Sequence, residues 1–115
     1  MRIRRYRDAD LESLVALFTA SVHALTAAHY DAAQRAAWAP QAPDLQAWRV
    51  RLAPLRVLVA EEQARAAGFI AYAMDGHLAL LYISPAYARR GVATLLCDRA
   101  EAQWARAGVT EAFTE

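Results

Sequence analysis

The sequence contains a single cysteine, Cys97, and no lysine. One cysteine excludes an internal disulfide, and without a second cysteine or a close group of histidines no zinc site with the usual ligand spacing can be drawn. We therefore expect no metal cofactor. A lone thiol also suits a reducing compartment, which predicts a cytoplasmic protein.

Long hydrophobic runs are also missing. No stretch approaches the roughly 18 apolar residues of a membrane span, and no apolar segment follows the arginines near the N-terminus, as it would in a signal peptide. Opposite charges nearly balance, with 13 arginines against 12 acidic residues. We therefore expect neither a membrane nor a nucleic acid as partner, and any anion site must be local.

The remaining composition is that of a folded protein. Of the 115 residues, 57% are hydrophobic and 22% are charged, which excludes a disordered chain. This length suffices for one core and is short for two. We expect a single domain over residues 1–115.

The N-terminal half alternates between strand and helix patterns. A strand is predicted over residues 2–7, and a helix over 9–25 follows from apolar residues at steps of three and four. Residues 31–38 suit a short second helix. A third helical piece is predicted from Asp44, a favourable capping residue, to Pro54.

The C-terminal half is predicted to begin with a hairpin of strands 55–60 and 67–74. After the turn dipeptide Asp75-Gly76, residues 77–84 form an apolar run that predicts a central strand covered on both faces. A helix over 92–107 ends at Gly108, and alternation over 109–115 predicts a last strand. The order predicts a mixed α/β (α+β) fold with a mostly antiparallel sheet flanked by helices.

The most informative segment is the connection between the strand 77–84 and the following helix. A helix N-terminus offers unpaired N–H groups to an anion, Gly91 leaves room for close approach, and Arg89 and Arg90 add positive charge. The alternative is an ordinary connection with a permissive glycine and two solvated arginines. A Walker phosphate loop is excluded because no Gly-Lys-Ser/Thr sequence is present.

The segment Ala88-Arg89-Arg90-Gly91-Val92-Ala93 resembles the Gln/Arg-x-x-Gly-x-Gly/Ala signature of the GNAT N-acetyltransferase superfamily. The predicted order of strands and helices resembles this family over essentially the whole chain. Ala88 departs from the signature, so the resemblance implies weakened rather than absent binding of the pyrophosphate.

This resemblance implies acetyl-CoA as the acetyl donor. Backbone N–H groups at the start of the helix hold the pyrophosphate, with the Thr94 hydroxyl nearby, and the strand before the loop pairs with the pantetheine arm. The implied acetyl-CoA residues are Leu81, Tyr82, Ile83, Arg89, Arg90, Gly91, Val92, Ala93 and Thr94.

Transfer to an amine requires a base, because an alkylammonium titrates near pH 10.4. His77 is our first candidate, since many family members place a catalytic Glu near this position, and the alternative is a histidine of the Gly76 turn. Tyr82 and Glu111 are weaker catalytic candidates, with a packed aromatic and a solvated carboxylate as their alternatives.

The acceptor site is expected near residues 29–38, which resemble a pattern in one bacterial branch of the superfamily. Tyr30, Gln34 and Trp38 recur every four residues and are predicted to form one wall of the substrate pocket, with plain helix packing as the alternative. His29 is a loop residue in the same segment.

Family members usually continue for another helix and two strands beyond the point where this chain ends. The strand 109–115 is therefore expected to be an unpaired edge, which predicts either a homodimer through that edge or a piece of a longer enzyme.

The function predicted by this resemblance is an N-acetyltransferase in which the primary amine of a small molecule or peptide attacks acetyl-CoA directly. The first alternative is a non-catalytic acyl-CoA-binding or partner-binding module of the same fold. The second is a helix-rich interaction domain with no affinity for CoA.

Overall fold

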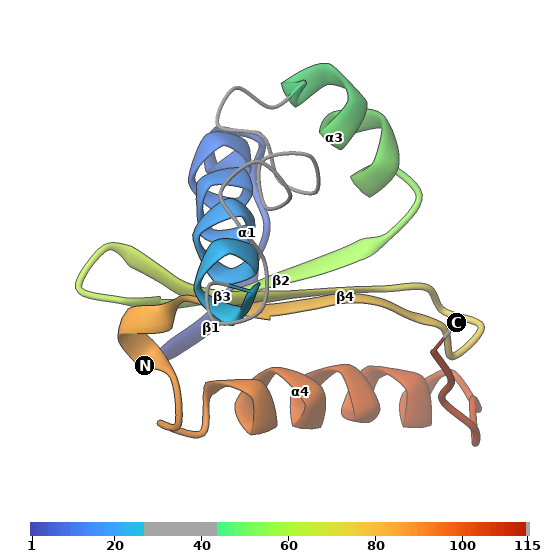
Figure 1. The fold of residues 1–115 in the computed structure, drawn as a ribbon. Coiled ribbons are helices and arrows are strands. Elements are labelled where there is room, and N and C mark those ends of the chain that lie inside the picture. Colours follow the sequence, from blue (N-terminus) through green and yellow to red (C-terminus); the bar gives the residue numbers. More distant parts are fainter. Residues whose placement is uncertain (27–43, 115) are drawn as a thin grey trace.

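An antiparallel sheet of four strands forms the centre of the computed structural model, which describes residues 1–26 and 44–114. The strands lie in chain order, and each pairs with the next in an antiparallel direction (Figure 1). They are β1 (Arg2–Arg5), β2 (Arg56–Glu62), β3 (Arg65–Tyr72) and β4 (Leu78–Ile83).

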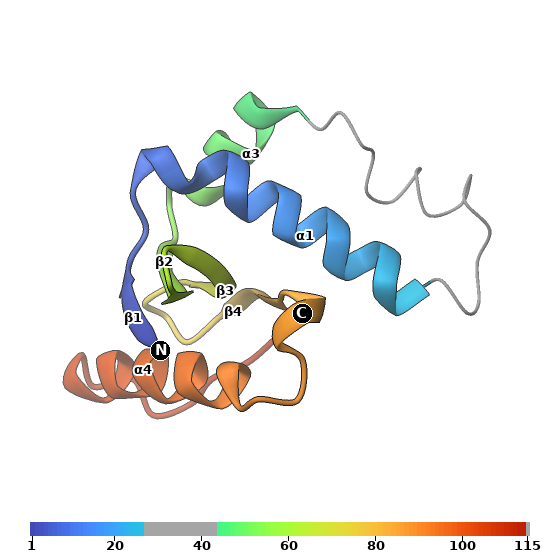
Figure 2. The same cartoon turned by 90° about the vertical axis from the view of Figure 1, so that its left-hand side faces the viewer.

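Helices cover both faces of this sheet. Helices α1 (Leu11–Thr26) and α3 (Leu45–Leu52) lie on one face, and α4 (Val92–Arg106) runs along the other (Figures 1 and 2). Two 3-10 turns, η1 (Asp8–Asp10) and η2 (Pro85–Tyr87), precede α1 and α4. Over the described residues, no helix has both the length and the apolar character needed to cross a bilayer.

Alternation along β3 divides the core into two layers. Phe69 and Ala71 pack into the layer beneath α1 and α3, while Ile70 and Tyr72 pack into the layer beneath α4. Strand β3 is therefore covered on both faces, as β2 is. The strand predicted at 77–84 has side chains in both core layers, as expected, but its predicted central position is wrong, because β4 lies at the edge of the described sheet.

The predicted strands at 2–7, 55–60 and 67–74 and the predicted helices at 9–25, 44–54 and 92–107 agree with the structure to within a few residues. Asp44 caps α3 by accepting a hydrogen bond from the Ala47 backbone N–H at 3.1 Å. The hairpin between β2 and β3 turns at Gln63 and Ala64, which both have positive φ, as the tight hairpin turns require. The predicted helix at 31–38 lies outside the described residues. The mixed α/β fold class is confirmed.

The segment after α4 pairs with the sheet at one point, not along a full strand as predicted. Phe113 forms a parallel bridge with His77, through the bonds Leu78 N–H to Phe113 O at 2.7 Å and Phe113 N–H to Gly76 O at 2.9 Å. The Val109 N–H instead caps α4 by bonding to the Trp104 carbonyl at 2.9 Å. Val109 therefore belongs to the cap of α4 and not to a strand. The homodimer expected through it stays a prediction.

Strand β1 is joined to the turn before α1 by a charged cluster centred on Arg4. Its guanidinium donates to both carboxylate oxygens of Asp10 at 2.8 Å and to Glu61 at 3.2 Å, and the Arg4 and Asp10 side chains are only 12% and 14% exposed. The Arg4 hydrogen bonds hold the pKa of Asp10 below its ordinary value, against an opposing effect of burial. The ion pair between Arg4 and Asp10 therefore contributes its full stabilisation only while Asp10 is ionised.

We predict that Asp10→Asn lowers the free energy of unfolding at pH 7 by about 2 kcal/mol, because a hydrogen-bonded buried ion pair is lost. Since the folded-state pKa of Asp10 is depressed, the native advantage is present above about pH 4 and disappears as the pH falls through the folded-state pKa. Urea unfolding at pH 7 and at pH 3.5 measures both effects. Asp98→Asn, at an exposed position on α4, is the control, and an equal loss in both variants contradicts the assignment.

Candidate functional site

The site predicted from the sequence is an open cleft of about 560 Å³ where the end of β4, η2 and the first turn of α4 meet α1. Its floor is the end of β4, and the small residues Ser21 and Ala24 of α1 form one side. The lining residues are Ser21, Ala24, Leu81, Tyr82, Ile83, Pro85, Tyr87, Ala88, Arg89, Gly91, Val92 and Ala93. The predicted acetyl-CoA residues make up more than half of this lining.

The part of β4 that lines the cleft has a free edge in the described structure. Among the described strands β4 pairs with β3 alone, and the bridge from His77 to Phe113 lies at the end of β4 away from the cleft. The pairing of β4 with β3 shifts by one residue between its two ends. Ala71 pairs with Leu80 and Tyr72 pairs with Leu78, so Ala79 is a bulged residue. A bulge bends its strand. Leu81 to Ile83 pair with β3 on one side, and within the described structure their other edge pairs with no strand and lies along the cleft.

The loop before α4 adopts the conformation that exposes the helix N-terminus. Arg89 and Gly91 have φ of 63° and 78°, and Gly91 is the N-cap, with no side chain to accept the first N–H groups. The first hydrogen bond of the helix joins the Leu95 N–H to the Gly91 carbonyl at 3.1 Å. The N–H groups of Val92, Ala93 and Thr94 precede that bond and have no partner within the helix. They offer an anion three donors at the positive end of the helix dipole.

A glycine on β3 allows α4 to begin so close to the sheet. A methyl group on Gly68 would lie 2.7 Å from the Ile83 side chain and 3.2 Å from that of Val92. These are contacts to both walls of the cleft. Gly68 thus sets the separation between the end of β4 and the first turn of α4, a role that the sequence analysis missed because glycine inside a strand has several explanations.

Arg90 does not line the cleft. Its guanidinium lies 3.5 Å from the Glu62 carboxylate at the end of β2 and 5.0 Å from the centre of the Tyr87 ring. Both side chains of the ion pair are partly exposed, so the pair is weak. Arg90 is therefore held beside the mouth of the cleft and has a competing anionic partner in Glu62.

Tyr82 lies in an aromatic group rather than pointing freely into the cleft. Its ring packs edge-on against Phe18 of α1 at 4.8 Å and lies 6.0 Å from Phe69 of β3, and Phe18 in turn contacts Trp48 of α3 at 4.8 Å. These contacts connect α1, α3 and the sheet directly beneath the cleft. These contacts favour the interpretation of Tyr82 as a packed aromatic residue, which the sequence analysis gave as the alternative to a catalytic role.

His77 is at the far end of β4 from the loop. Its ring stacks on Phe113 with centroids 5.2 Å apart, and its backbone N–H donates to the Asp75 carboxylate at 2.9 Å. An extended strand rises about 3.3 Å per residue, so His77 and Leu81 are roughly 13 Å apart along β4. Glu111 belongs to the same end of the molecule, where its carbonyl packs against Gly76.

The predicted residues thus divide into two groups. The loop and strand residues come together, with Arg90 and Thr94 adjoining the cleft, whereas His77 and Glu111 lie beyond its described walls. Tyr30, Gln34 and Trp38 lie outside the described residues. The sequence analysis missed Ser21, because its place beside the cleft depends on how α1 packs over the sheet, which no local pattern in the sequence shows.

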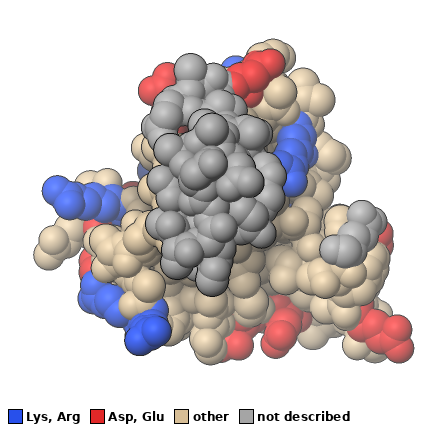
Figure 3. All heavy atoms as spheres, viewed as in Figure 1, with Lys and Arg blue, Asp and Glu red and all other residues tan. Residues whose placement is uncertain are grey.

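The charged side chains are unevenly distributed. In Figure 3 arginines gather on the side that carries the β2–β3 hairpin and the loop before α4, and acidic side chains gather toward the end of α4. Residues 1–26 and 44–114 contain no group of three His, Cys, Asp or Glu side chains placed to hold a metal ion. The local positive charge near the loop favours an anionic ligand.

Comparison with known proteins supports the family resemblance seen in the sequence. The family profile described as Acetyltransferase (GNAT) domain matches residues 26–114. The uncharacterized N-acetyltransferase YafP of Escherichia coli is 35% identical over 96 residues, which cover 84% of this chain and 62% of YafP. The chain thus spans less than two thirds of that curated relative.

Two solved structures share the fold. A GCN5-related N-acetyltransferase from Rhodopseudomonas palustris is 34% identical with a TM-score of 0.82, covering 93% of this chain and 67% of its own. The PaiA N-acetyltransferase of Thermoplasma acidophilum, solved with coenzyme A, is 22% identical with a TM-score of 0.78. The match covers 94% of this chain and 74% of the PaiA chain. With a family profile that matches most of the sequence, this chain belongs to the GNAT acetyltransferase family.

Proposed function

We propose that the protein binds acetyl-CoA in the cleft and transfers its acetyl group to a primary amine. The observation that carries this proposal is the meeting, along one cleft, of the first turn of α4 and the outer edge of β4, whose backbone groups are unpaired within residues 1–26 and 44–114. The first suits a pyrophosphate and the second suits the amide groups of a pantetheine arm. The bound coenzyme A of the Thermoplasma relative supports the same ligand class.

In the proposed reaction the neutral amine nitrogen attacks the thioester carbonyl carbon directly. The carbon–sulfur bond breaks, the thiolate of CoA leaves with the electron pair, and the amine loses one proton to a base. A backbone N–H at the edge of β4 stabilises the carbonyl oxygen as it gains charge. No covalent enzyme intermediate is needed.

His77 is the proposed base. If the pyrophosphate lies at the first turn of α4, the pantetheine arm follows β4 back toward its first residue and brings the thioester in that direction. Phe113 restricts the imidazole by stacking on it. The acceptor is proposed to be the amine of a small molecule or peptide, with Tyr30, Gln34 and Trp38 as the proposed wall of its pocket, and the protein is proposed to act in the cytoplasm.

A non-catalytic acyl-CoA-binding module is the second candidate. It is favoured by the cleft itself, because its described lining contains neither a carboxylate nor an imidazole. Such a module would retain acetyl-CoA without releasing CoA when amines are added. A thiol-release assay with a panel of primary amines distinguishes the two functions.

We predict that calorimetry detects acetyl-CoA binding that Ala93→Glu abolishes and Arg90→Glu weakens by about tenfold, the amount expected for one charge-assisted contact. Ala93→Glu places an acidic side chain in the first turn of α4, where it favours the helix dipole, so its loss of binding is not explained by unfolding. Raising the salt concentration should weaken native binding.

Arg99→Glu is the control for these variants, because it makes the same charge change farther along α4. Native protein that fails to bind acetyl-CoA would contradict the proposal. Equal weakening by Arg99→Glu and Arg90→Glu would show that net charge, not the loop, determines affinity.

We predict that His77→Gln lowers the rate of acetyl transfer by about 100-fold or more, the usual contribution of a general base. Initial rates of CoA release with a primary amine in excess measure this loss. His23→Gln is the matched control on α1 and should keep the native rate, and an unchanged rate in His77→Gln removes the assignment.

A further inference from the structure

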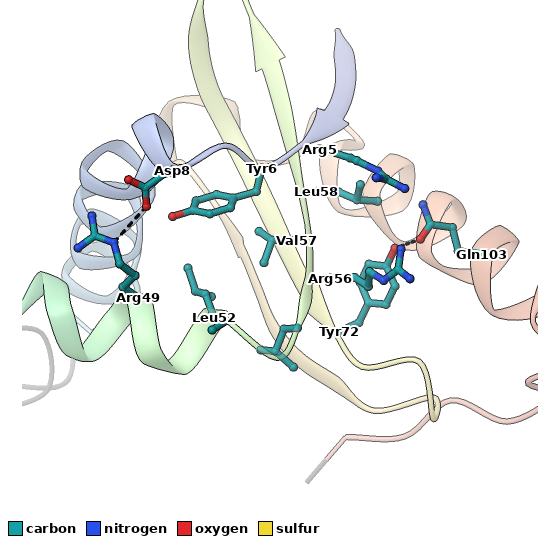
Figure 4. Close-up of a pocket in the computed structure, with 12 residues that line it drawn as sticks. Arg5, Tyr6, Asp8, Arg49, Leu52, Arg56, Val57, Leu58, Tyr72 and Gln103 are labelled. Atoms are coloured by element: carbon teal, nitrogen blue, oxygen red, sulfur yellow. Dashed lines mark hydrogen bonds and ion pairs between the residues drawn. The ribbon is translucent and has the colours of Figure 1, made fainter.

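We propose that Arg5, Arg56 and Gln103 form a second anion-binding site, for the carboxylate or phosphate group of a small molecule, at the corner of the sheet shown in Figure 4. These residues line a groove of about 300 Å³ that shares no lining residue with the cleft. The proposal goes beyond acetyl transfer and does not depend on it.

The three side chains come from different elements and are brought together by strand register. Arg5 of β1 faces Leu58 of β2, and Arg56 of β2 faces Tyr72 of β3. Leu58 and Tyr72 belong to the core layer beneath α4, and side chains two residues apart on a strand share a face. Both arginines therefore emerge on the side of the sheet that α4 covers, next to Gln103.

Tyr72 holds Gln103 in a fixed position beneath the site. It has no exposed surface, and its hydroxyl hydrogen-bonds to Oε1 of Gln103 (Figure 4). Its ring packs edge-on against Trp104 at 5.3 Å, and the Trp104 indole N–H donates to the Ala73 carbonyl at 2.8 Å. With Oε1 occupied, the Gln103 amide has its two N–H donors left for a ligand.

The groove has donors in excess of acceptors. Among the described residues, no acidic side chain lies within 4.0 Å of either guanidinium, whereas Arg4, Arg49 and Arg90 are all paired. Asp8 is the acidic residue of the described groove lining, and it is already bonded to Arg49 at 3.0 Å. Burial raises the pKa of Tyr72, so its hydroxyl remains neutral and supplies no negative charge.

The ligand class follows from this donor set. Two planar guanidiniums and an amide suit an anion with at least two oxygens, and carboxylate and phosphate both meet that condition. The apolar lining residues Leu52 and Val57 are buried on the opposite face of the sheet, toward α1 and α3, so the anion is expected at the α4 side of the groove (Figure 4). A small organic acid is therefore a better match than a metal ion or an amine.

The test is a titration of the ¹⁵N-labelled protein with inorganic phosphate, followed by the amide signals in two-dimensional NMR spectra. We expect saturable shifts at two separate places, the first turn of α4 and the group of Arg5, Arg56, Tyr72 and Gln103. A parallel titration with acetate distinguishes a site that prefers phosphate from one that accepts any carboxylate, and saturation at this corner by either ion supports the proposal.

The double variant Arg5→Gln/Arg56→Gln should weaken binding at this corner by about tenfold or more and leave binding at α4 unchanged. Arg51→Gln/Arg65→Gln is the matched control with the same loss of charge elsewhere. Tyr72→Phe keeps the ring and should weaken binding about threefold, because it frees the Gln103 amide to rotate.

Shifts confined to the first turn of α4, or a native-like affinity at the corner in the double variant, would overturn the proposal. Equal weakening in the control variant would also overturn it, because net charge would then account for binding. The spectra themselves report whether each variant is folded.

Discussion

The close approach of α4 to β3 at Gly68 is the contact on which the rest of the structure depends. It places the first turn of α4 beside the end of β4, and a side chain at Gly68 would meet both Ile83 and Val92. Beyond that point α4 follows the sheet, with Leu96, Ala100 and Trp104 buried in succession. The small size of Gly68 therefore allows this close approach at the cleft, and the buried row of α4 side chains holds the rest of the helix against the sheet.

The two ends of β4 have different neighbours, and the bulge at Ala79 lies between them. On one side of it, Leu78 is hydrogen-bonded to Phe113, and on the other side the strand has a free edge beside the cleft. An uninterrupted pairing along β4 would leave no backbone groups for a ligand. The proposed acetyl-CoA site therefore depends on the outer edge of β4, which pairs with no strand of the described structure beside the cleft.

The arginines illustrate how a nearly neutral protein can still offer local anion sites. Arg4 is committed to Asp10 and Glu61 and contributes to stability, whereas Arg90 has only a weak, partly exposed partner in Glu62. Arg5 and Arg56 have no acidic partner among the described residues. The net charge of +1 conceals this difference, since it depends on which side chains meet rather than on how many there are.

Most of the fold was determined by the sequence itself. Apolar periodicity located α1 and α4, the dipeptide Asp75-Gly76 located a turn, and the segment from Ala88 to Ala93 identified the loop and the family. These are local signals, in which neighbouring residues suffice to specify the backbone.

Only the tertiary structure decided the remaining features. Strand β4 lies at the edge of the described sheet although its sequence is as apolar as that of a central strand, because partners, not composition, determine position. The contributions of Ser21 and Gly68 to the cleft, and of Arg5, Arg56 and Gln103 to one groove, join residues far apart in the chain. Such contacts depend on strand register and helix packing, which no local pattern specifies.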